Sequence, residues 1–314
     1  MRAVVFPGQG SQAVGMGKDL AATFASAREV FAEVEDALEQ NLTRMMFEGP
    51  EQDLMMTENT QPALMSLSVA IMRVLDKEYG VRLKDVASYV AGHSLGEYSA
   101  LCAADAISLS DTARLLRTRG RAMQKAVPFG KGAMAAILGL DAEQARALSA
   151  EASDGEVCEA ANDNAPGQVV VSGHAGAVKR AIEIAKKLGV KRSVLLPVSA
   201  PFHCALMRPA AEAMREALAG VSIASPTVPV VPNVTARATD DPEEIRKLLV
   251  EQVCGAVRWR ESVQFLKSRG VGSLVEVGSG RVLSGLARRI DRSMEGTPVG
   301  TLEEIEAFAK AVAA

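Results

Sequence analysis

The sequence predicts an α/β protein in which a parallel-sheet main domain carries a small inserted domain. Short β-like runs alternate with long helical patterns, an order typical of a sheet flanked by helices. Between residues 128 and 196 the order changes to strand–helix–strand–strand–helix–strand (βαββαβ), which is the order of a ferredoxin-like unit. We therefore expect a main domain of residues 1–127 and 197–314, interrupted by a ferredoxin-like insert of residues 128–196.

The first half of the main domain contains two apolar runs that end in glycine-rich turns. Residues 3–6 are the first expected strand, and residues 7–11 the turn that follows it. A second, buried strand at 87–91 breaks at Gly92, and a helix begins almost at once. Helical patterns cover residues 28–40, 61–76, 95–103 and 111–126.

A breaker cluster at 128–132 begins the insert, and Pro197 marks the return to the main domain. Within the insert, strands are expected at 133–138, 157–161, 168–172 and 193–196, helices at 142–152 and 175–188, and a turn at 162–167. The rest of the chain predicts helices near 242–253 and 262–269, and a strand at 273–277 that turns into a final helix.

Composition and charge exclude several classes of protein. The chain has 314 residues, of which 48% are apolar, enough for a large core, and its formal net charge of −3 argues against nucleic-acid binding. No apolar run is long enough to span a membrane, and the N-terminus lacks a secretory pattern. The four cysteines are scattered and predict neither a metal site nor disulfides. We expect a cytoplasmic protein that binds no nucleic acid and no membrane.

Gly92-His93-Ser94-Leu95-Gly96 is a G-x-S-x-G motif between an expected strand and an expected helix. Such a sharp turn exposes a serine hydroxyl at the edge of the sheet, and N–H groups at the helix start favour a developing oxyanion. Ser94 is therefore a candidate nucleophile, with the Leu95 N–H as an oxyanion donor. The alternative is that Ser94-x-x-Glu97 is a capping box, in which the serine only caps the helix.

The chain has three histidines, so the general base is chosen by elimination. His93 adjoins Ser94, and adjacent side chains on a tight turn diverge. His174 lies in the insert, at a strand end. His203 lies on a loop just after the return to the main domain, where catalytic groups often collect, and we favour it as the base. The neighbouring Cys204 is expected to be a small core residue.

The expected helix at 111–126 places one arginine among apolar side chains. Arg119 falls within the stripe of Leu115, Leu116, Ala122, Met123 and Ala126, whereas Arg114, Arg117 and Arg121 fall on the other side and are expected to be solvated. A buried guanidinium needs an anionic partner. From spacing alone, that partner is either a protein carboxylate or the carboxylate of a substrate.

Gln252 shows a similar but weaker signal. It continues a helical stripe set by Ile245, Leu248 and Leu249. A polar residue there is either hydrogen-bonded in the core or lines a site.

Taken together, these motifs resemble those of the malonyl-CoA:acyl carrier protein transacylases of the bacterial, free-standing type, over nearly the whole chain. The stretches that carry the resemblance are FPGQGSQ at 6–12, GHSLGE at 92–97, RGRAMQ at 119–124, NDNAPGQ at 162–168 and Phe202-His203. The resemblance implies a hydrolase-like α/β main domain with the ferredoxin-like insert. It also implies malonyl transfer from malonyl-CoA to the phosphopantetheine thiol of acyl carrier protein, in fatty acid biosynthesis.

The resemblance further assigns roles to residues. Ser94 is the implied nucleophile and His203 its base, while the Gln9 and Leu95 N–H groups form the oxyanion hole. Arg119 grips the malonyl carboxylate, and Gln252 orients the histidine through its main-chain carbonyl. Phe202, Met123 and Asn162 complete the implied substrate-binding set. No cofactor or metal is expected, the partners are acyl carrier protein and malonyl-CoA or coenzyme A, and we expect a monomer.

Three other functions remain as alternatives. A serine esterase or thioesterase would use water as the acyl acceptor, and a non-catalytic scaffold would only bind carrier protein. A dinucleotide site at Gly8-Gln9-Gly10 is not favoured, because the next glycine is Gly15 and G-x-G-x-x-G is not matched. For an acidic carrier protein, candidate basic contacts are Arg288, Arg289, Arg292, Lys191 and Arg192.

Overall fold

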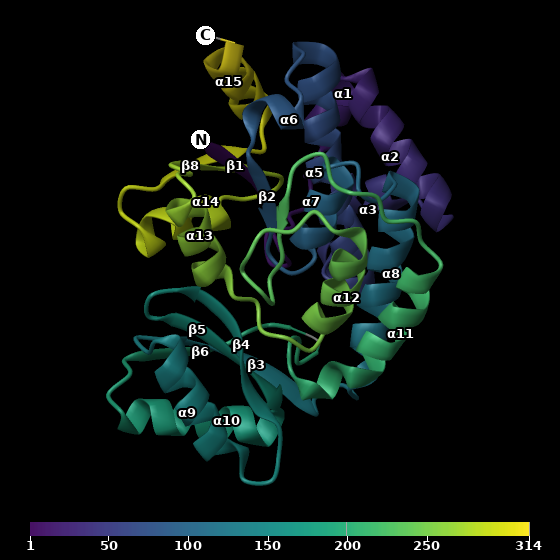
Figure 1. Cartoon of the computed structure of the whole chain (residues 1–314). Helices are drawn as coiled ribbons and strands as arrows, with labels where there is room; N and C mark the ends of the chain where they lie inside the picture. Colours follow the sequence, from purple (N-terminus) through teal and green to yellow (C-terminus); the bar gives the residue numbers. More distant parts are fainter. Residues whose placement is uncertain (199, 314) are drawn as a thin grey trace.

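The computed structural model describes residues 1–198 and 200–313. It is a mixed α/β structure with two separate sheets, one of five strands and one of four. Figure 1 shows the larger sheet and most helices in the upper part of the molecule, and the smaller sheet with α9 (Ala142–Ser153) and α10 (Ala175–Lys187) below them. The two parts are joined by the chain just after α8 (Leu109–Ala126) and again near residue 198.

The larger sheet is parallel and has the strand order β7-β2-β1-β8-β9. Its strands are β1 (Arg2–Phe6), β2 (Tyr89–Gly92), β7 (Val230–Val231), β8 (Ser273–Val277) and β9 (Glu295–Val299). Of these, β1, β2 and β8 match expected strands, whereas β7 lies inside a proline-rich stretch. Because all five run in one direction, their carboxyl ends meet at one edge of the sheet, and ligand sites of open parallel sheets form at such an edge.

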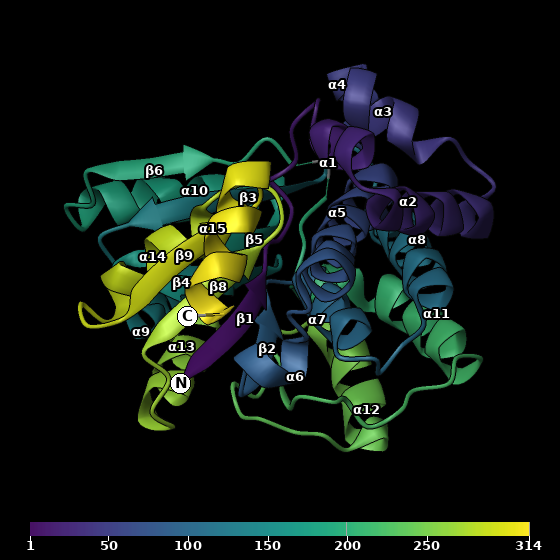
Figure 2. The same cartoon turned by 90° about the horizontal axis from the view of Figure 1, so that it is seen from above.

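Alternate side chains of β1 enter different cores, as the period of a strand requires. Val4 and Phe6 pack in the largest core cluster with α5 (Thr57–Tyr79) and α7 (Gly96–Ala103). Ala3 and Val5 pack on the opposite face with residues of α13 (Trp259–Ser268) and α14 (Val282–Ile290). Figure 2 shows this sheet between its two helical layers, seen from above. Both faces are therefore buried, which explains why the strands read as continuous apolar runs.

The smaller sheet is antiparallel and has the order β4-β5-β3-β6. Its strands are β3 (Gly132–Leu138), β4 (Cys158–Ala165), β5 (Gln168–His174) and β6 (Arg192–Leu195). With α9 and α10, the chain order is the strand–helix–strand–strand–helix–strand order expected from the sequence. The helices cover one face of this sheet, and the other face is turned towards the larger part (Figure 1).

The remaining helices belong to the larger part. They are α1 (Lys18–Thr23), α2 (Ala25–Leu38), α3 (Leu42–Glu48), α4 (Glu51–Leu54), α6 (Leu83–Val86), the 3₁₀ turn η1 (Ala205–Met207), α11 (Arg208–Ala219), α12 (Pro242–Gln252) and α15 (Leu302–Ala313). Throughout residues 1–198 and 200–313, the helices are too short or too polar to cross a membrane.

One local expectation is wrong. The polar run at 162–167 reads as a turn, but β4 continues through it to Ala165. Val257 of the larger part explains the extension, because its N–H donates to the Ala161 carbonyl at 2.8 Å and its carbonyl accepts from the Asp163 N–H at 2.9 Å. Asp163 also forms an ion pair with Arg260 at 2.7 Å. The polar side chains of this strand thus contact the larger part.

Candidate active site

Ser94 stands on a sharp turn between β2 and α7, at the carboxyl edge of the parallel sheet. Its φ of 54° is in the left-handed region, which a non-glycine residue seldom adopts. The turn is too tight for side chains on either flank. A Cβ on Gly92 would lie 1.9 Å from the Gly96 carbonyl carbon, and one on Gly96 would lie 2.3 Å from the Phe6 carbonyl oxygen. The two glycines of the motif therefore let the backbone approach this closely and leave the serine at the apex.

The alternative in which Ser94 only caps the helix is not what the structure shows. The N-cap residue of α7 is Leu95, with no side-chain capping hydrogen bond. The Ser94 hydroxyl lies instead 2.8 Å from Nε2 of His203.

His203 is oriented by main-chain carbonyls rather than by an acidic side chain. Its Nδ1 lies 2.9 Å from the Gln252 carbonyl oxygen and 3.2 Å from that of Gly255, so Nδ1 carries the proton and donates. The imidazole is 3% exposed. Burial, reinforced by the positive charge of Arg119, lowers its pKa from 6.5 to about 3. Nε2 is therefore an unprotonated acceptor facing the Ser94 hydroxyl near neutral pH.

The other two histidines are engaged elsewhere, as the elimination argument expects. His93 Nε2 pairs with Asn164 Oδ1 at 2.8 Å, and His174 Nδ1 accepts the Val157 N–H at 2.9 Å. The Cys204 side chain is fully buried, and its burial raises the thiol pKa to about 11, so it is not an activated nucleophile.

Arg119 is buried in α8 with only neutral hydrogen-bond partners. Its Nη1 donates to Gln61 Oε1 at 3.0 Å, and its Nη2 donates to Ser94 Oγ at 3.1 Å and to Gln252 Oε1 at 2.9 Å. Its Nε has no partner, and no carboxylate of the described residues forms an ion pair with the guanidinium. Among the described residues, no protein carboxylate therefore pairs directly with Arg119, and Glu97 interacts with it only through its charge.

The expectation that the other three arginines of α8 are solvated is wrong for Arg117. Its side chain is buried, and Nε donates to the Glu58 carbonyl oxygen at 2.9 Å while Nη2 contacts Gln40. The start of α5 and the end of α2 cover this face of α8, which helical spacing alone does not reveal.

Gln252 ends α12, and its side chain connects three parts of the site. Oε1 accepts from Arg119, and Nε2 donates to the Ser94 carbonyl oxygen at 3.0 Å and to Glu97 Oε2 at 2.9 Å. Its own main-chain carbonyl accepts from His203. The polar residue in an apolar helical stripe is therefore both buried and part of the site.

Two residues of the site were not singled out from the sequence. Asn233, just after β7, accepts the Ser94 N–H at Oδ1 (2.8 Å) and donates from Nδ2 to the Gly92 carbonyl oxygen (2.6 Å). Glu97, on α7, is 1% exposed, and burial raises its pKa from 4.5 to about 7. Its Oε2 accepts the Asn233 N–H at 2.8 Å in addition to the Gln252 amide.

The side chains of the remaining expected residues form no hydrogen bond to Ser94, His203 or Arg119 in the described part of the chain. Gln9 follows β1, and its side chain donates to Thr57 at 3.3 Å. Met123 accepts a weak hydrogen bond from Gln61, the residue that also binds Arg119. Phe202 is buried in the main core beside His203. Asn162 is buried on β4, where it is bridged to Val257.

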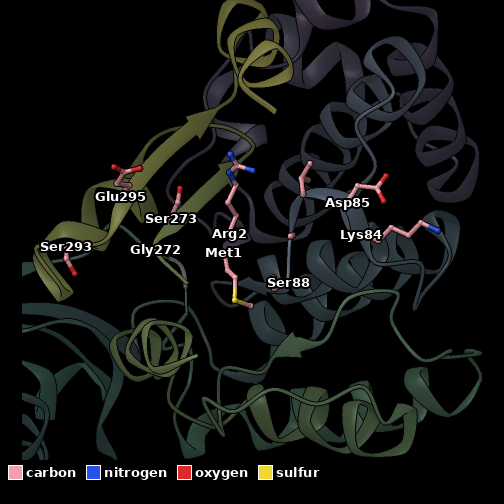
Figure 3. A pocket seen from close by; sticks show the side chains of 11 residues that line it. Met1, Arg2, Lys84, Asp85, Ser88, Gly272, Ser273, Ser293 and Glu295 are labelled. Atoms are coloured by element: carbon pink, nitrogen blue, oxygen red, sulfur yellow. The ribbon is translucent and has the colours of Figure 1, made fainter. Parts of the chain in front are cut away.

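A hollow of about 730 Å³ lies elsewhere on the protein. Figure 3 shows residues that line it, among them Arg2, Ser88, Ser273 and Glu295. These stand at or just before the amino ends of β1, β2, β8 and β9, whereas Ser94 follows a carboxyl end. The hollow therefore lies at the opposite edge of the sheet from the candidate site. Residues 1–198 and 200–313 also hold no group of three or more His, Cys, Asp or Glu side chains suited to a metal ion.

Comparison with known proteins adds an independent line of argument. The acyl transferase domain family matches residues 3–300. The malonyl CoA-acyl carrier protein transacylase of Escherichia coli K12 is 46% identical over 310 residues, which cover 99% of this chain and 98% of that protein.

Solved structures agree. The acyl-carrier-protein S-malonyltransferase of Bartonella henselae superimposes with a TM-score of 0.97 at 52% identity, over 100% of this chain and 99% of that one. A malonyl-transacylase solved with a type II polyketide acyl carrier protein superimposes with a TM-score of 0.95 at 44% identity, over 99% of each chain.

Proposed function

The chain belongs to the acyl transferase domain family, and we propose that it moves a malonyl group from malonyl-CoA to the phosphopantetheine thiol of an acyl carrier protein. The chain is thus an acyltransferase of the acyl-carrier-protein S-malonyltransferase class. One observation carries the choice of acyl group. A buried guanidinium without a carboxylate partner lies 3.1 Å from the Ser94 hydroxyl, which in turn lies 2.8 Å from His203. An acyl group with its own carboxylate supplies the missing anion.

Acylation of Ser94 begins the proposed reaction. His203 Nε2 takes the hydroxyl proton as Oγ attacks the thioester carbonyl of malonyl-CoA. The tetrahedral intermediate collapses, the carbon–sulfur bond breaks, and coenzyme A leaves as a thiol that receives the proton from His203. The carbonyl oxygens of Gln252 and Gly255 stabilise the imidazolium through Nδ1–H, so no acidic third residue is needed.

The oxyanion is held by main-chain N–H groups. The Ser94 N–H already donates to Asn233, so the donor from this turn is Leu95, at the start of α7. Gln9, on the turn after the neighbouring strand β1, supplies the second donor. In the described part of the chain, neither of these two N–H groups donates to a main-chain carbonyl. Both are therefore available to a developing negative charge.

Transfer to the carrier protein reverses the chemistry. The pantetheine thiol gives its proton to His203 and attacks the malonyl ester, and Ser94 leaves with that proton. The polyketide-type relative was solved with its acyl carrier protein, which supports such a partner here. Arg288 and Arg289 lie in the last turn of α14, and Arg289 donates to the Gln168 side chain of the smaller part at 2.6 Å. They remain the candidate contacts for an acidic partner.

The finer description of the fold follows the same proposal. We describe the larger part, residues 1–127 and 197–314, as hydrolase-like because a strand–serine–helix turn stands at its carboxyl edge. We describe residues 128–196 as ferredoxin-like because of their strand order and helix placement. Phe202, Met123 and Asn162 are the proposed walls of the acyl and pantetheine path. The four cysteines are free thiols, which accords with a cytoplasmic enzyme of fatty acid biosynthesis.

The test is covalent labelling. After incubation with malonyl-CoA, the intact protein should gain the mass of one malonyl group, and peptide mapping should place it on Ser94. Ser94→Ala should fold and remain unlabelled. Ser99→Ala, which changes a buried serine on α7, the helix that follows the Ser94 turn, is the matched control and should label like the wild type. Malonyl found on another residue, or no labelling of a folded wild-type protein, contradicts the proposal.

A further inference from the structure

Both main-chain polar groups of the nucleophile are held by amide side chains from other elements. Asn233 bridges the turn, accepting the Ser94 N–H and donating to the Gly92 carbonyl oxygen. Gln252 donates to the Ser94 carbonyl oxygen. Because Ser94 has a φ of 54°, its conformation persists only where the surroundings determine it. These two amides do so, together with the Glu97 N–H, which donates to the Ser94 carbonyl oxygen at 3.1 Å.

One oxygen atom binds both residues, Asn233 through its main chain and Gln252 through its side chain. Glu97 Oε2 accepts the Asn233 main-chain N–H at 2.8 Å and the Gln252 Nε2 at 2.9 Å. Through Asn233, this oxygen sets the turn that bears the nucleophile. Through Gln252, it sets the amide whose Oε1 accepts from Arg119. The Glu97 side chain is buried, and it forms no hydrogen bond to Ser94 Oγ, His203 or Arg119 in the described part of the chain.

We propose that Glu97 and Asn233 are positioning residues, and that one oxygen of Glu97 sets both the reactivity of Ser94 and the selectivity of Arg119. The inference rests on the proposed malonyl transfer only for its selectivity part. The reactivity part concerns the serine alone and holds for any electrophile that Ser94 attacks.

The proposed role of Glu97 is that of a hydrogen-bond acceptor, while Arg119 interacts with it only through charge. Both of its partners are neutral donors, and a protonated carboxyl keeps one oxygen that accepts equally well. A neutral amide at this position also retains such an oxygen. Alanine, in contrast, leaves two buried donors unpaired, and they turn towards other acceptors.

The experiment measures two rates for each folded variant. Reaction with a fluorophosphonate reports Ser94 reactivity without involving a substrate carboxylate, and acylation by malonyl-CoA reports reactivity and carboxylate recognition together. Variants are Glu97→Ala, Glu97→Gln and Asn233→Ala. The control is Glu276→Ala, another buried carboxyl, which accepts the N–H groups of Leu283 and Ser284 away from the site. Circular dichroism melts establish that each variant is folded at the assay temperature.

We expect Asn233→Ala to slow both reactions by about 10-fold or more, because the serine turn relaxes. Glu97→Ala should slow fluorophosphonate labelling similarly and malonyl acylation further, since Arg119 also loses its support. Glu97→Gln should stay within about 3-fold of the wild type in both. Glu276→Ala should melt at a lower temperature with unchanged rates.

The results that overturn the inference are equally definite. If Asn233→Ala reacts with both reagents at the wild-type rates, the Ser94 turn does not need the hydrogen bonds of Asn233. Wild-type rates in Glu97→Ala, or a loss in Glu97→Gln as large as in Glu97→Ala, show that the shared oxygen is not the essential feature. If Glu97→Ala does not fold, Asn233→Ala and Glu97→Gln decide. Should the wild type react with fluorophosphonate but not with malonyl-CoA, the proposed function fails while the positioning of Ser94 is still tested.

Discussion

The Nη2 of Arg119 lies 3.1 Å from the Oγ of Ser94, so the guanidinium touches the nucleophile directly. A carboxylate bound to Arg119 is thereby placed a short carbon chain away from the serine. If Arg119 binds the substrate carboxylate as proposed, this separation predicts selectivity for a short dicarboxylic acyl group. Burial is the main cause of the lowered pKa of the His203 imidazole, and the positive charge of Arg119 lowers that pKa further.

Arg119→Ala should lose malonyl transfer and keep acetyl transfer. Removing one partner of a buried, hydrogen-bonded charge pair costs roughly 2–5 kcal/mol, so kcat/KM for malonyl-CoA should fall by about 30-fold or more. Acetyl-CoA lacks the carboxylate, and its kcat/KM should persist or rise. Steady-state kinetics with both thioesters measure the ratio.

Arg117→Ala is the matched control for that change. Arg117 is buried on the same helix but binds the Glu58 carbonyl, away from Ser94. It should lower the melting temperature without changing the malonyl-to-acetyl ratio. Equal losses for both substrates in Arg119→Ala would mean that Arg119 supports the fold rather than the substrate.

The rate of acylation should show no acid limb near the usual pKa of histidine. The pKa of His203 is lowered to about 3, chiefly by burial, so the imidazole remains neutral far below pH 6.5. Since kcat/KM reports the free enzyme, its value for malonyl-CoA should be nearly constant from about pH 5 to 8. A limb with a midpoint near pH 6.5 would contradict a buried, neutral base. An inflection near pH 7 that disappears in Glu97→Gln would instead show that the charge of Glu97 matters.

Sequence reasoning located the residues that interrupt a clear pattern. Ser94 stands between two glycines after an apolar strand, and Arg119 and Gln252 are polar residues in apolar helical stripes. Their burial follows from the 3.6-residue period alone. Arg117 was placed wrongly because the period of α8 does not show that α2 and α5 cover its second face.

The sequence analysis does not identify Asn233 and Glu97 as site residues, for two different reasons. Asn233 lies in a proline-rich stretch without periodicity, and its partners Gly92 and Ser94 are about 140 positions away in the sequence. Glu97 fits a capping box, which predicts an exposed helix start. An observation against an exposed helix start is that the rest of α7 is uncharged and largely apolar. Such a composition is typical of a helix that is buried on all sides. Likewise, the polar residues at the end of β4 indicate a turn. Their strand conformation depends on pairing with Val257, which the local sequence does not show.

Glu97→Gln should stabilise the protein at alkaline pH and have little effect at acid pH. The folded pKa of Glu97 is about 7, above the 4.5 of the unfolded chain, so the folded state binds more protons between these values. Stability from this group is therefore greatest below about pH 4.5 and falls as the pH rises to 7. The loss is on the order of 3 kcal/mol for such a shift, and glutamine does not incur it.

Urea unfolding at pH 5 and pH 8 measures this effect as a difference between variant and wild type. Taking the difference removes the contribution of His203, whose lowered pKa has the opposite sign: its stability is lost as the pH falls below 6.5. A variant that is equally stabilised at both pH values would show that Glu97 does not titrate in this range.

The malonyl ester on Ser94 should persist in water and react rapidly with a carrier-protein thiol. Hydrolysis needs a water molecule positioned between His203 Nε2 and the ester carbonyl. When the malonyl carboxylate binds Arg119, the acyl chain occupies the space in front of Ser94, because the two side chains are only 3.1 Å apart. A pantetheine thiol enters along the path that coenzyme A has left and meets a neutral His203.

Isolated malonyl-enzyme, followed by intact mass spectrometry with and without holo carrier protein, tests this. Slow decay in buffer and fast decay with carrier protein identify a transferase, and apo carrier protein, which lacks the thiol, is the control for binding alone. Arg119→Ala loaded with acetyl should hydrolyse faster than malonylated wild type, because the acyl group is no longer anchored across the site and water gains access. Rapid release of free malonate from the wild type in buffer would make water the true acceptor, and the chain would then be a hydrolase built on an acyltransferase fold.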